Sequence, residues 1–204
     1  MSDAIIISLV SLASSVLAGF GVKWYELRKK HQLEKKHAEH RDRLHNILVV
    51  YRAMEDMISK GYADRAILFM GSNGGARPRV GHPYQVTAVH AVSNHQVAEG
   101  IMEKFKVVTV DAQYVELLIR LLDSKDHVYY EDTSVMPEGR LKEIYMGEGI
   151  KSALICYLGH SQKELFYCSF TNYDGPVLNK KTKPVLALAT DAIRHSFSLY
   201  DINN

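Results

Sequence analysis

The chain has 204 residues, which leaves room for one domain of ordinary size beside a terminal segment. Its 25 lysines and arginines nearly balance 23 aspartates and glutamates, and the net charge of +2 gives no reason to expect a nucleic-acid partner. The two cysteines, Cys156 and Cys168, form no Cys-x-x-Cys pair, which excludes zinc-ribbon and thioredoxin-type motifs. Both are expected to be reduced and buried in strands.

The first distinctive segment, Ala4–Val22, is mostly apolar and contains no charged residue. Its length suits a helix that crosses the hydrocarbon core of a bilayer. Eight basic and four acidic residues follow between Lys23 and Arg43, and basic residues beside a membrane helix stay on the cytoplasmic side. We therefore predict a single-pass anchor over residues 1–23 in the inner or plasma membrane, with the N-terminus outside and the C-terminal domain in the cytoplasm. A cleaved signal peptide and a helix buried in protein are the alternatives.

Small residues recur within this segment at the spacing of one helix face, at Ala4, Ser8, Ser11, Ser15 and Gly19. A seam of small residues lets membrane helices approach closely, and serines can hydrogen-bond across the contact. We therefore predict that identical copies associate through this seam. The alternative is that the serines are only tolerated in a single span.

Residues 24–60 are predicted to form one long stalk helix, because no proline or glycine occurs between Lys23 and Lys60 and helix-forming residues dominate. A heptad-like seam continues the small-residue seam at a similar period. Its first half includes polar histidines and its second half is mostly apolar, so we expect a weak coiled coil that strengthens toward the domain, ending before Gly61. The oligomer seam of the stalk comprises Leu33, Leu44, Ile47, Tyr51 and Met54.

Residues 61–204 are predicted to form an α+β domain with an antiparallel sheet and helices on the opposite face. Runs rich in β-forming residues predict strands over residues 65–70, 84–92, 127–130, 151–158 and 164–170, and the last two form a hairpin. Helices are predicted over residues 111–122, 138–145 and 180–200, the first of them capped by Asp111. The face of the last helix expected to point inward comprises Val185, Leu188, Ala192, Ile193 and Phe197.

Four sequence features follow one another between about residues 47 and 200. They are the strand ADRAILFM with a glycine-rich loop after it, the short strand HVYYEDT before a small helix, the pair GIKSALICYL and KELFYCSF, and the NYDGP turn before a long helix. This order resembles a GAF domain. GAF-like domains bind small molecules between the sheet and the loops after the middle strands, and many are dimers joined through their terminal helices. The resemblance therefore implies a ligand-gated or ligand-stabilised module.

The resemblance also limits which ligands the domain is expected to take. No cysteine stands in the loop region after the central helix, where a bilin would attach, and the cyclic-nucleotide constellation is incomplete. The polar residues best placed to point into a pocket are Tyr129, Glu131, Asp132 and Thr133, with Tyr157 and Tyr167 from the hairpin strands. Ordinary core or surface tyrosines are the alternative. The sequence predicts no catalytic site, no metal site and no cofactor.

The function expected from these features is that of a membrane-anchored, self-associating sensory or binding module that is not an enzyme and has no catalytic output domain. Its expected partners are the membrane, further copies of itself, and a small molecule or a protein. One alternative is a structural or scaffold subunit of a larger assembly, in which the GAF-like fold serves only for packing. A second alternative is a small membrane-active effector.

Overall fold

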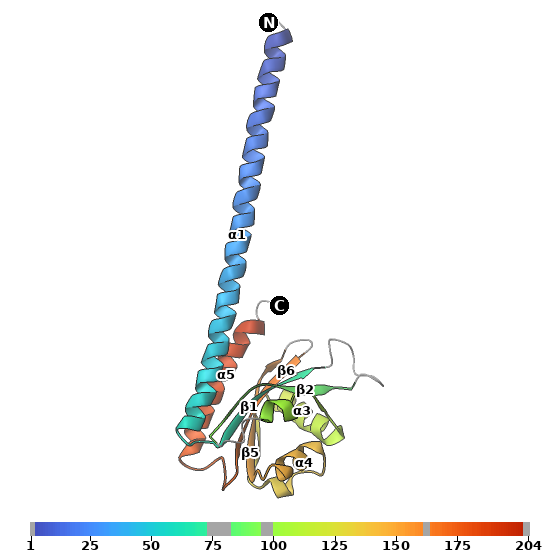
Figure 1. The fold of residues 1–204 in the computed structure, drawn as a ribbon, viewed down its shortest axis with the longest axis vertical. Coiled ribbons are helices and arrows are strands. Elements are labelled where there is room, and N and C mark those ends of the chain that lie inside the picture. Colours follow the sequence, from blue (N-terminus) through green and yellow to red (C-terminus); the bar gives the residue numbers. More distant parts are fainter. Residues whose placement is uncertain (1–2, 73–82, 95–99, 161–163, 202–204) are drawn as a thin grey trace. The chain divides into compact units, whose positions relative to one another are not determined.

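The computed structural model describes the backbone of residues 3–72, 83–94, 100–160 and 164–201, and no side chain of residues 3–22, 39, 43 and 197–201. The chain divides into two compact units, Met1–His45 and Asn46–Asn204, which are described separately. The described elements, of which Figure 1 labels the larger ones, are α1 (Asp3–Ser59), β1 (Arg65–Ser72), β2 (Gln85–Ser93), α2 (Ile101–Lys104), β3 (Val108–Thr109), α3 (Ala112–Ser124), β4 (His127–Tyr130), the 3-10 turn η2 (Thr133–Val135), α4 (Arg140–Gly147), β5 (Ser152–His160), β6 (Glu164–Asn172) and α5 (Thr182–Asp201).

The helix predicted over residues 24–60 is part of α1, whose backbone is helical without interruption from Asp3 to Ser59. Its role as a coiled-coil stalk stays a prediction. Gly61, with a φ of 68°, ends it in the left-handed conformation that glycine adopts at helix ends. Among the residues that the structure describes, no helix has a stretch both long and apolar enough to cross a membrane. The predicted span Ala4–Val22, with its small-residue seam, falls among the residues whose side chains are not described.

The sheet of the second unit has the strand order β3-β2-β1-β6-β5-β4, and every neighbouring pair is antiparallel. The predicted hairpin is confirmed as β5 and β6, in which Cys156 lies directly opposite Cys168. β3 and α2 are short elements that the sequence pattern did not predict. Strands at both edges of the sheet are short, which limits the backbone groups left for pairing with another chain.

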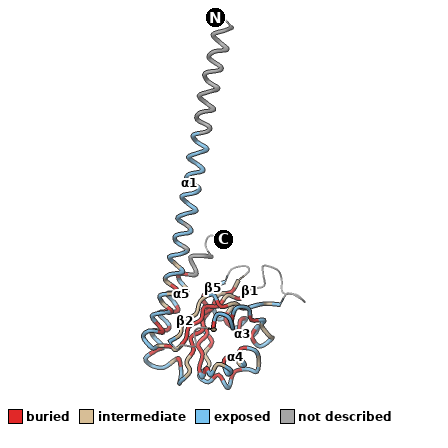
Figure 2. Tube along the Cα trace, viewed as in Figure 1, coloured by how far each residue is buried: buried red, intermediate tan, exposed pale blue. Residues whose placement is uncertain are grey.

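Helices cover both faces of the sheet, whereas the sequence pattern predicted helices on one face only. The last turns of α1, through Val50 and Met54, share one buried cluster with α5 and with alternate residues of β1, β5 and β6. α2, α3 and α4 share a second cluster with the other face, around Phe69, Tyr114 and Tyr145. Figure 2 shows these buried residues gathered in the sheet and on the helix sides turned toward it. Because helices cover both faces, β1 and β5 are buried or half-buried at nearly every position.

The inward face of α5 differs from the predicted one. Leu186, Ala189 and Ile193 are buried against the sheet, whereas Leu188 is 72% exposed. Ala192 is also exposed and Val185 is half-buried. The predicted Phe197 lies outside the described side chains. Of the four predicted residues whose side chains are described, only Ile193 is fully buried.

The caps of α3 and α4 meet at one residue. Asp111 caps α3 as predicted, because its carboxylate accepts a hydrogen bond from the Tyr114 N–H at 2.8 Å. The same carboxylate accepts a bond from the Arg140 N–H at 2.5 Å. A Cβ at Gly139 would come within 2.8 Å of the Asp111 carboxylate, so a larger residue there would have to displace this carboxylate. α4 begins at Arg140, two residues after the predicted Glu138.

Candidate functional site

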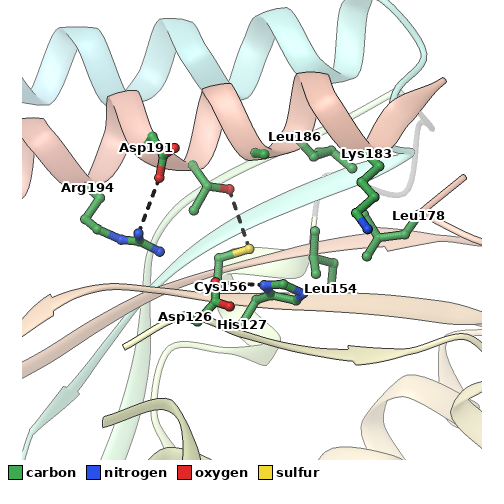
Figure 3. Close-up of a pocket in the computed structure, with 11 residues that line it drawn as sticks. Asp126, His127, Leu154, Cys156, Leu178, Lys183, Leu186, Asp191 and Arg194 are labelled. Atoms are coloured by element: carbon green, nitrogen blue, oxygen red, sulfur yellow. Dashed lines mark hydrogen bonds and ion pairs between the residues drawn. The ribbon is translucent and has the colours of Figure 1, made fainter. Parts of the chain in front are cut away.

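A pocket lies between α5 and the β4–β5 edge of the sheet, and we call it the α5 pocket (Figure 3). Its volume is about 190 Å³. Side chains from the start of β4, from β5, from the turn before α5 and from α5 itself surround it. The lining residues are Asp126, His127, Leu154, Cys156, Leu178, Lys183, Leu186, Ala187, Thr190, Asp191 and Arg194.

The floor of the α5 pocket is apolar. Leu154 and Cys156 of β5 and Leu186 of α5 are all buried, and each belongs to the cluster that also holds α1. The buried Thr190 hydroxyl donates a hydrogen bond to the Cys156 sulfur at 3.5 Å. A ligand with an apolar part could therefore be buried here without leaving a polar group unpaired.

The rim of the α5 pocket carries charged side chains. The Asp126 carboxylate is 2.8 Å from His127 Nδ1, and the Asp191 carboxylate accepts a hydrogen bond from Arg194 at 3.3 Å. Arg194 also donates from Nε to the Tyr157 carbonyl at 3.3 Å. Lys183 has no ion-pair partner among the residues that the structure describes, and Figure 3 shows its side chain directed from α5 toward Leu178. One unpaired positive charge therefore stands beside an apolar floor.

Local sequence features place these rim residues. α3 ends at Ser124 and is followed by Lys125, whose φ of 51° is left-handed, and this turn leads directly into Asp126 and β4. At the other side of the pocket, the Asn179 side chain accepts hydrogen bonds from the N–H groups of Lys181 and Thr182, both at 2.9 Å. This cap fixes where α5 begins, and with it the position of Lys183 in the first turn.

The six residues predicted to bind a ligand are not brought together. In the register of the sheet Tyr129 lies opposite Leu154, and it packs against the cluster on the α5 side, close to the α5 pocket. Tyr157 and Tyr167 are cross-strand neighbours whose side chains belong to the cluster on the other face. Because Tyr129 and the hairpin tyrosines lie on opposite faces, no single pocket can contain all three.

Three of the predicted ligand-binding residues, Glu131, Asp132 and Thr133, lie in the turn after β4. The Asp132 side chain accepts a hydrogen bond from the Ser134 N–H at 2.8 Å and so caps the 3-10 turn, which also lowers the pKa of this exposed carboxyl. The buried Thr133 donates its hydroxyl hydrogen to the Ile150 carbonyl at 2.5 Å. Glu131 is exposed beside them. These residues stabilise the turn between β4 and α4, and none of them lines the α5 pocket.

The tyrosines on the second face form a buried cluster with their own hydrogen bonds. The hydroxyls of Tyr114 and Tyr167 are 2.7 Å apart, and those of Tyr145 and Ser169 are also 2.7 Å apart. Burial raises the pKa of Tyr145 to about 12, and it raises the pKa of both Tyr114 and Tyr167 well above the usual value for tyrosine. These phenols are therefore neutral, and their hydroxyls are satisfied inside the protein.

The seam predicted for self-association divides into two parts. Leu33 is 50% exposed, Leu44 is 54% exposed and Ile47 is also exposed, so these side chains are available to a partner. Tyr51 and Met54 instead pack within their own domain, and Met54 is 0% exposed. Met54 is therefore wrongly placed in the oligomer seam, because the sheet and α5 have already buried it. The small-residue part of the seam, from Ala4 to Gly19, lies outside the described side chains.

Tyr51 stacks on the His90 ring of β2, with ring centroids 3.7 Å apart and planes 13° apart. Burial lowers the pKa of His90, and the nearby Glu55 carboxylate opposes this only in part. The His90 imidazole therefore binds a proton less readily in the folded state than in the unfolded state. The resulting stability is fully present above the unfolded pKa of about 6.5 and is lost as the pH falls below it.

We therefore expect the free energy of unfolding to fall between pH 7 and pH 5, and to fall less in His90→Gln. Urea unfolding across this range measures both slopes. His31→Gln, at an exposed position of α1, should keep the wild-type slope. Equal slopes for wild type and His90→Gln would contradict the assignment.

The two cysteines are free and buried, as predicted. Burial raises the pKa of the Cys156 thiol to about 12 and that of Cys168 well above its usual value. At pH 8 a thiol with a pKa of about 12 is ionised in roughly one molecule in 10⁴, and only the thiolate is nucleophilic. We expect iodoacetamide to leave both thiols unmodified in the folded protein and to modify both in urea, as measured by intact mass. Modification at similar rates in both conditions would contradict this.

The residues that sequence reasoning missed are the charged rim of the α5 pocket, above all Asp126, Lys183 and Arg194. About 60 residues separate Asp126 from the charges of α5, and no motif links them. Each is an ordinary surface residue type in its local context, at a strand start or on a helix. Only the packing of α5 against β4 and β5 brings them to one pocket.

Among known proteins, only solved structures are found to be similar to this chain, and they are similar in fold. No protein-family model matches the chain, and no curated protein matches it. Solved structures do match. A GAF domain region from Geobacter sulfurreducens is 13% identical and aligns with a TM-score of 0.52 over 78% of this chain and 97% of its own.

Two further structures agree with this match. The GAF domain of a two-component sensor histidine kinase from Bacillus halodurans is 14% identical, with a TM-score of 0.51 over 75% of this chain and 94% of its own. A GAF domain of Synechocystis in its photoproduct state is 8% identical, with a TM-score of 0.54 over 78% and 99%. Identities this low establish the fold alone. The second unit of this chain is therefore an α+β domain with the GAF fold, in which flanking helices cover a curled antiparallel sheet.

Proposed function

We propose that this protein is a membrane-anchored, self-associating sensory module whose GAF-fold domain binds a small molecule in the α5 pocket. The domain acts by binding and not by catalysis. It faces the cytoplasm, with the N-terminus on the other side of the membrane. The observation that carries the proposal is a pocket with an apolar floor, built from α5 and the sheet of a fold otherwise found in sensor proteins.

The position of the α5 pocket suggests how an occupant could be sensed. Leu154 and Leu186 line the pocket and also belong to the buried cluster that contains Val50 and Met54 of α1. A ligand that favours one position of α5 would therefore favour one packing of the last turns of α1. The helix of α1 runs without a break from these last turns to Asp3. A change in the packing of the last turns is therefore the signal that a second copy could detect.

Native mass spectrometry of the detergent-extracted full chain tests ligand binding and self-association together. We expect a mass of two or more copies, with a co-purified small molecule that is lost on denaturation. A monomer with no bound small molecule would overturn the proposal. The scaffold alternative predicts copies without a ligand, and the internally satisfied hydroxyls of Tyr114 and Tyr167 are the observation in its favour.

The membrane anchor is proposed on the sequence of Ala4–Val22. Leu12→Arg places a charge near the middle of the segment, which costs about 2.5–3.5 kcal/mol for insertion. We expect this variant to leave the membrane fraction after carbonate extraction, whereas the matched Leu33→Arg in the exposed part of α1 stays with it. Loss of the wild-type chain from the membrane fraction, or identical behaviour of the two variants, would refute the anchor.

Self-association through the small-residue seam can be tested by disulfide crosslinking in membranes. Single cysteines at Ser8, Ser11 and Ser15 should crosslink more than cysteines at Leu9, Leu12 and Val16, which lie on other faces of a helix. Cys156 and Cys168 remain in place because both are buried. Equal crosslinking at the two sets of positions would rule out this seam.

A further inference from the structure

We propose that the α5 pocket takes a small organic monocarboxylate, whose apolar chain lies against Leu154, Cys156 and Leu186 and whose carboxylate pairs with Lys183. The inference rests on the proposed function, because it names the ligand class for the pocket to which that function is assigned. It uses three properties of the pocket: its size, its unpaired charge and its apolar floor.

The size of the pocket limits the ligand. Its volume of about 190 Å³ is small for a ligand site. Pockets for drug-sized ligands and cofactors are larger, at about 300–1,000 Å³. The pocket therefore suits a small ligand, such as a carboxylic acid with a chain of about six carbons.

One cation of the rim is available to an anion. The Asp191 carboxylate is paired with Arg194, and the Asp126 carboxylate contacts His127 Nδ1. Lys183 is the rim cation for which the described residues supply no ion pair, and its side chain extends toward Leu178 and the sheet (Figure 3). An incoming carboxylate would give the Lys183 ammonium an ion-pair partner.

A single ammonium also favours a carboxylate over a phosphate. Phosphate sites use several donors, commonly an arginine fork or a row of backbone N–H groups. Here the Arg194 guanidinium is already bonded to Asp191 and to the Tyr157 carbonyl. The Lys183 ammonium is therefore the rim cation that remains to pair with a single carboxylate of the ligand.

The floor of the pocket accepts a hydrocarbon chain. Leu154 and Leu186 present carbon atoms, and Cys156 is a neutral thiol because burial raises its pKa to about 12. The thiol already accepts the hydrogen bond of Thr190. A second polar group deep in the ligand would find no partner among the described floor residues, so the ligand has one polar end.

The test is isothermal titration calorimetry on the full chain in detergent, with hexanoate as probe and hexanamide as its uncharged match, corrected against empty micelles. We expect hexanoate to bind at least about tenfold more tightly than hexanamide, a difference of about 1.4 kcal/mol. Lys183→Gln should remove this preference. Lys181→Gln, an exposed lysine outside the pocket lining, should retain it.

A second variant keeps the proposal testable if Lys183→Gln changes the start of α5. Ala187→Trp fills the pocket from an exposed position, so it should fold normally and bind neither probe. Equal affinities for the two probes, full hexanoate affinity in Lys183→Gln, or no hexanoate binding by the wild type would each overturn the proposal. If native mass spectrometry still finds another small molecule bound, only the ligand class fails; if it finds none, the sensory function fails as well.

Discussion

Glu148→Leu is expected to lower the free energy of unfolding by about 3–5 kcal/mol, because it leaves a buried guanidinium without its counter-charge. Arg65 at the start of β1 is 1% exposed, and its guanidinium donates to the Glu148 carboxylate, whose side chain is 10% exposed. Arg65 also donates from Nε to the Thr171 hydroxyl at 3.2 Å and lies over the Phe105 ring at 5.8 Å. These contacts hold the guanidinium inside the domain, where it cannot regain water without unfolding the start of the sheet.

Urea unfolding followed by far-ultraviolet circular dichroism measures this loss. Lys104→Gln is the matched control, since the Lys104 ammonium is 3.3 Å from the same carboxylate but is mostly exposed, and it should cost less than about 1 kcal/mol. The double variant Arg65→Met with Glu148→Leu should recover much of the loss, because no charge then remains buried. A single Glu148→Leu variant as stable as the wild type would show that the pair is not buried in solution.

Ile193→Ala is expected to cost about 2–5 kcal/mol of unfolding free energy. The Ile193 side chain is 0% exposed and packs in the cluster that joins α5, the sheet and the last turns of α1. Removing most of this side chain leaves a cavity that rigid strands on one side and two helices on the other cannot fully close. The same urea unfolding measurement applies.

Leu188→Ala is the matched control on the same helix. Leu188 is 72% exposed, so its truncation should change stability by no more than about 0.5 kcal/mol. This pair of variants decides between the inward face that the structure has and the face that sequence periodicity predicted, which included both residues. Equal losses for the two variants would restore the predicted face.

α5 shows why periodicity did not select the buried face. Val185, Leu186, Leu188, Ala189 and Ala192 surround the helix on more than one side, so several stripes of apolar residues satisfy a helical repeat. The sheet decides among them, because only the stripe through Leu186, Ala189 and Ile193 meets β5 and β6 while leaving room for α1. Helix propensity predicts that α5 forms, whereas packing against the sheet determines which side of α5 is buried.

The candidate tyrosines illustrate the same limit in the sheet. Strand alternation predicts that Tyr157 and Tyr167 share a face once their register is known, and the β5–β6 pairing places them opposite each other. Sequence alone could not relate Tyr129 to them, since β4 joins the sheet beside β5 with its own register. The predicted tyrosines therefore lie on two faces of the sheet. The α5 pocket is instead lined by residues that share no sequence pattern.

The sequence by itself determined the long helix ending before Gly61, the main strands, the cap at Asp111 and the order of elements that resembles a GAF domain. Each of these depends on interactions between residues close in the chain, where propensity, capping and alternation act. Only the tertiary structure decided that α1 ends inside the domain core, which side of α5 is buried, and that Lys183 stands with Asp126 and Arg194 around one pocket. Those outcomes depend on contacts between segments far apart in sequence, and no local pattern records such contacts.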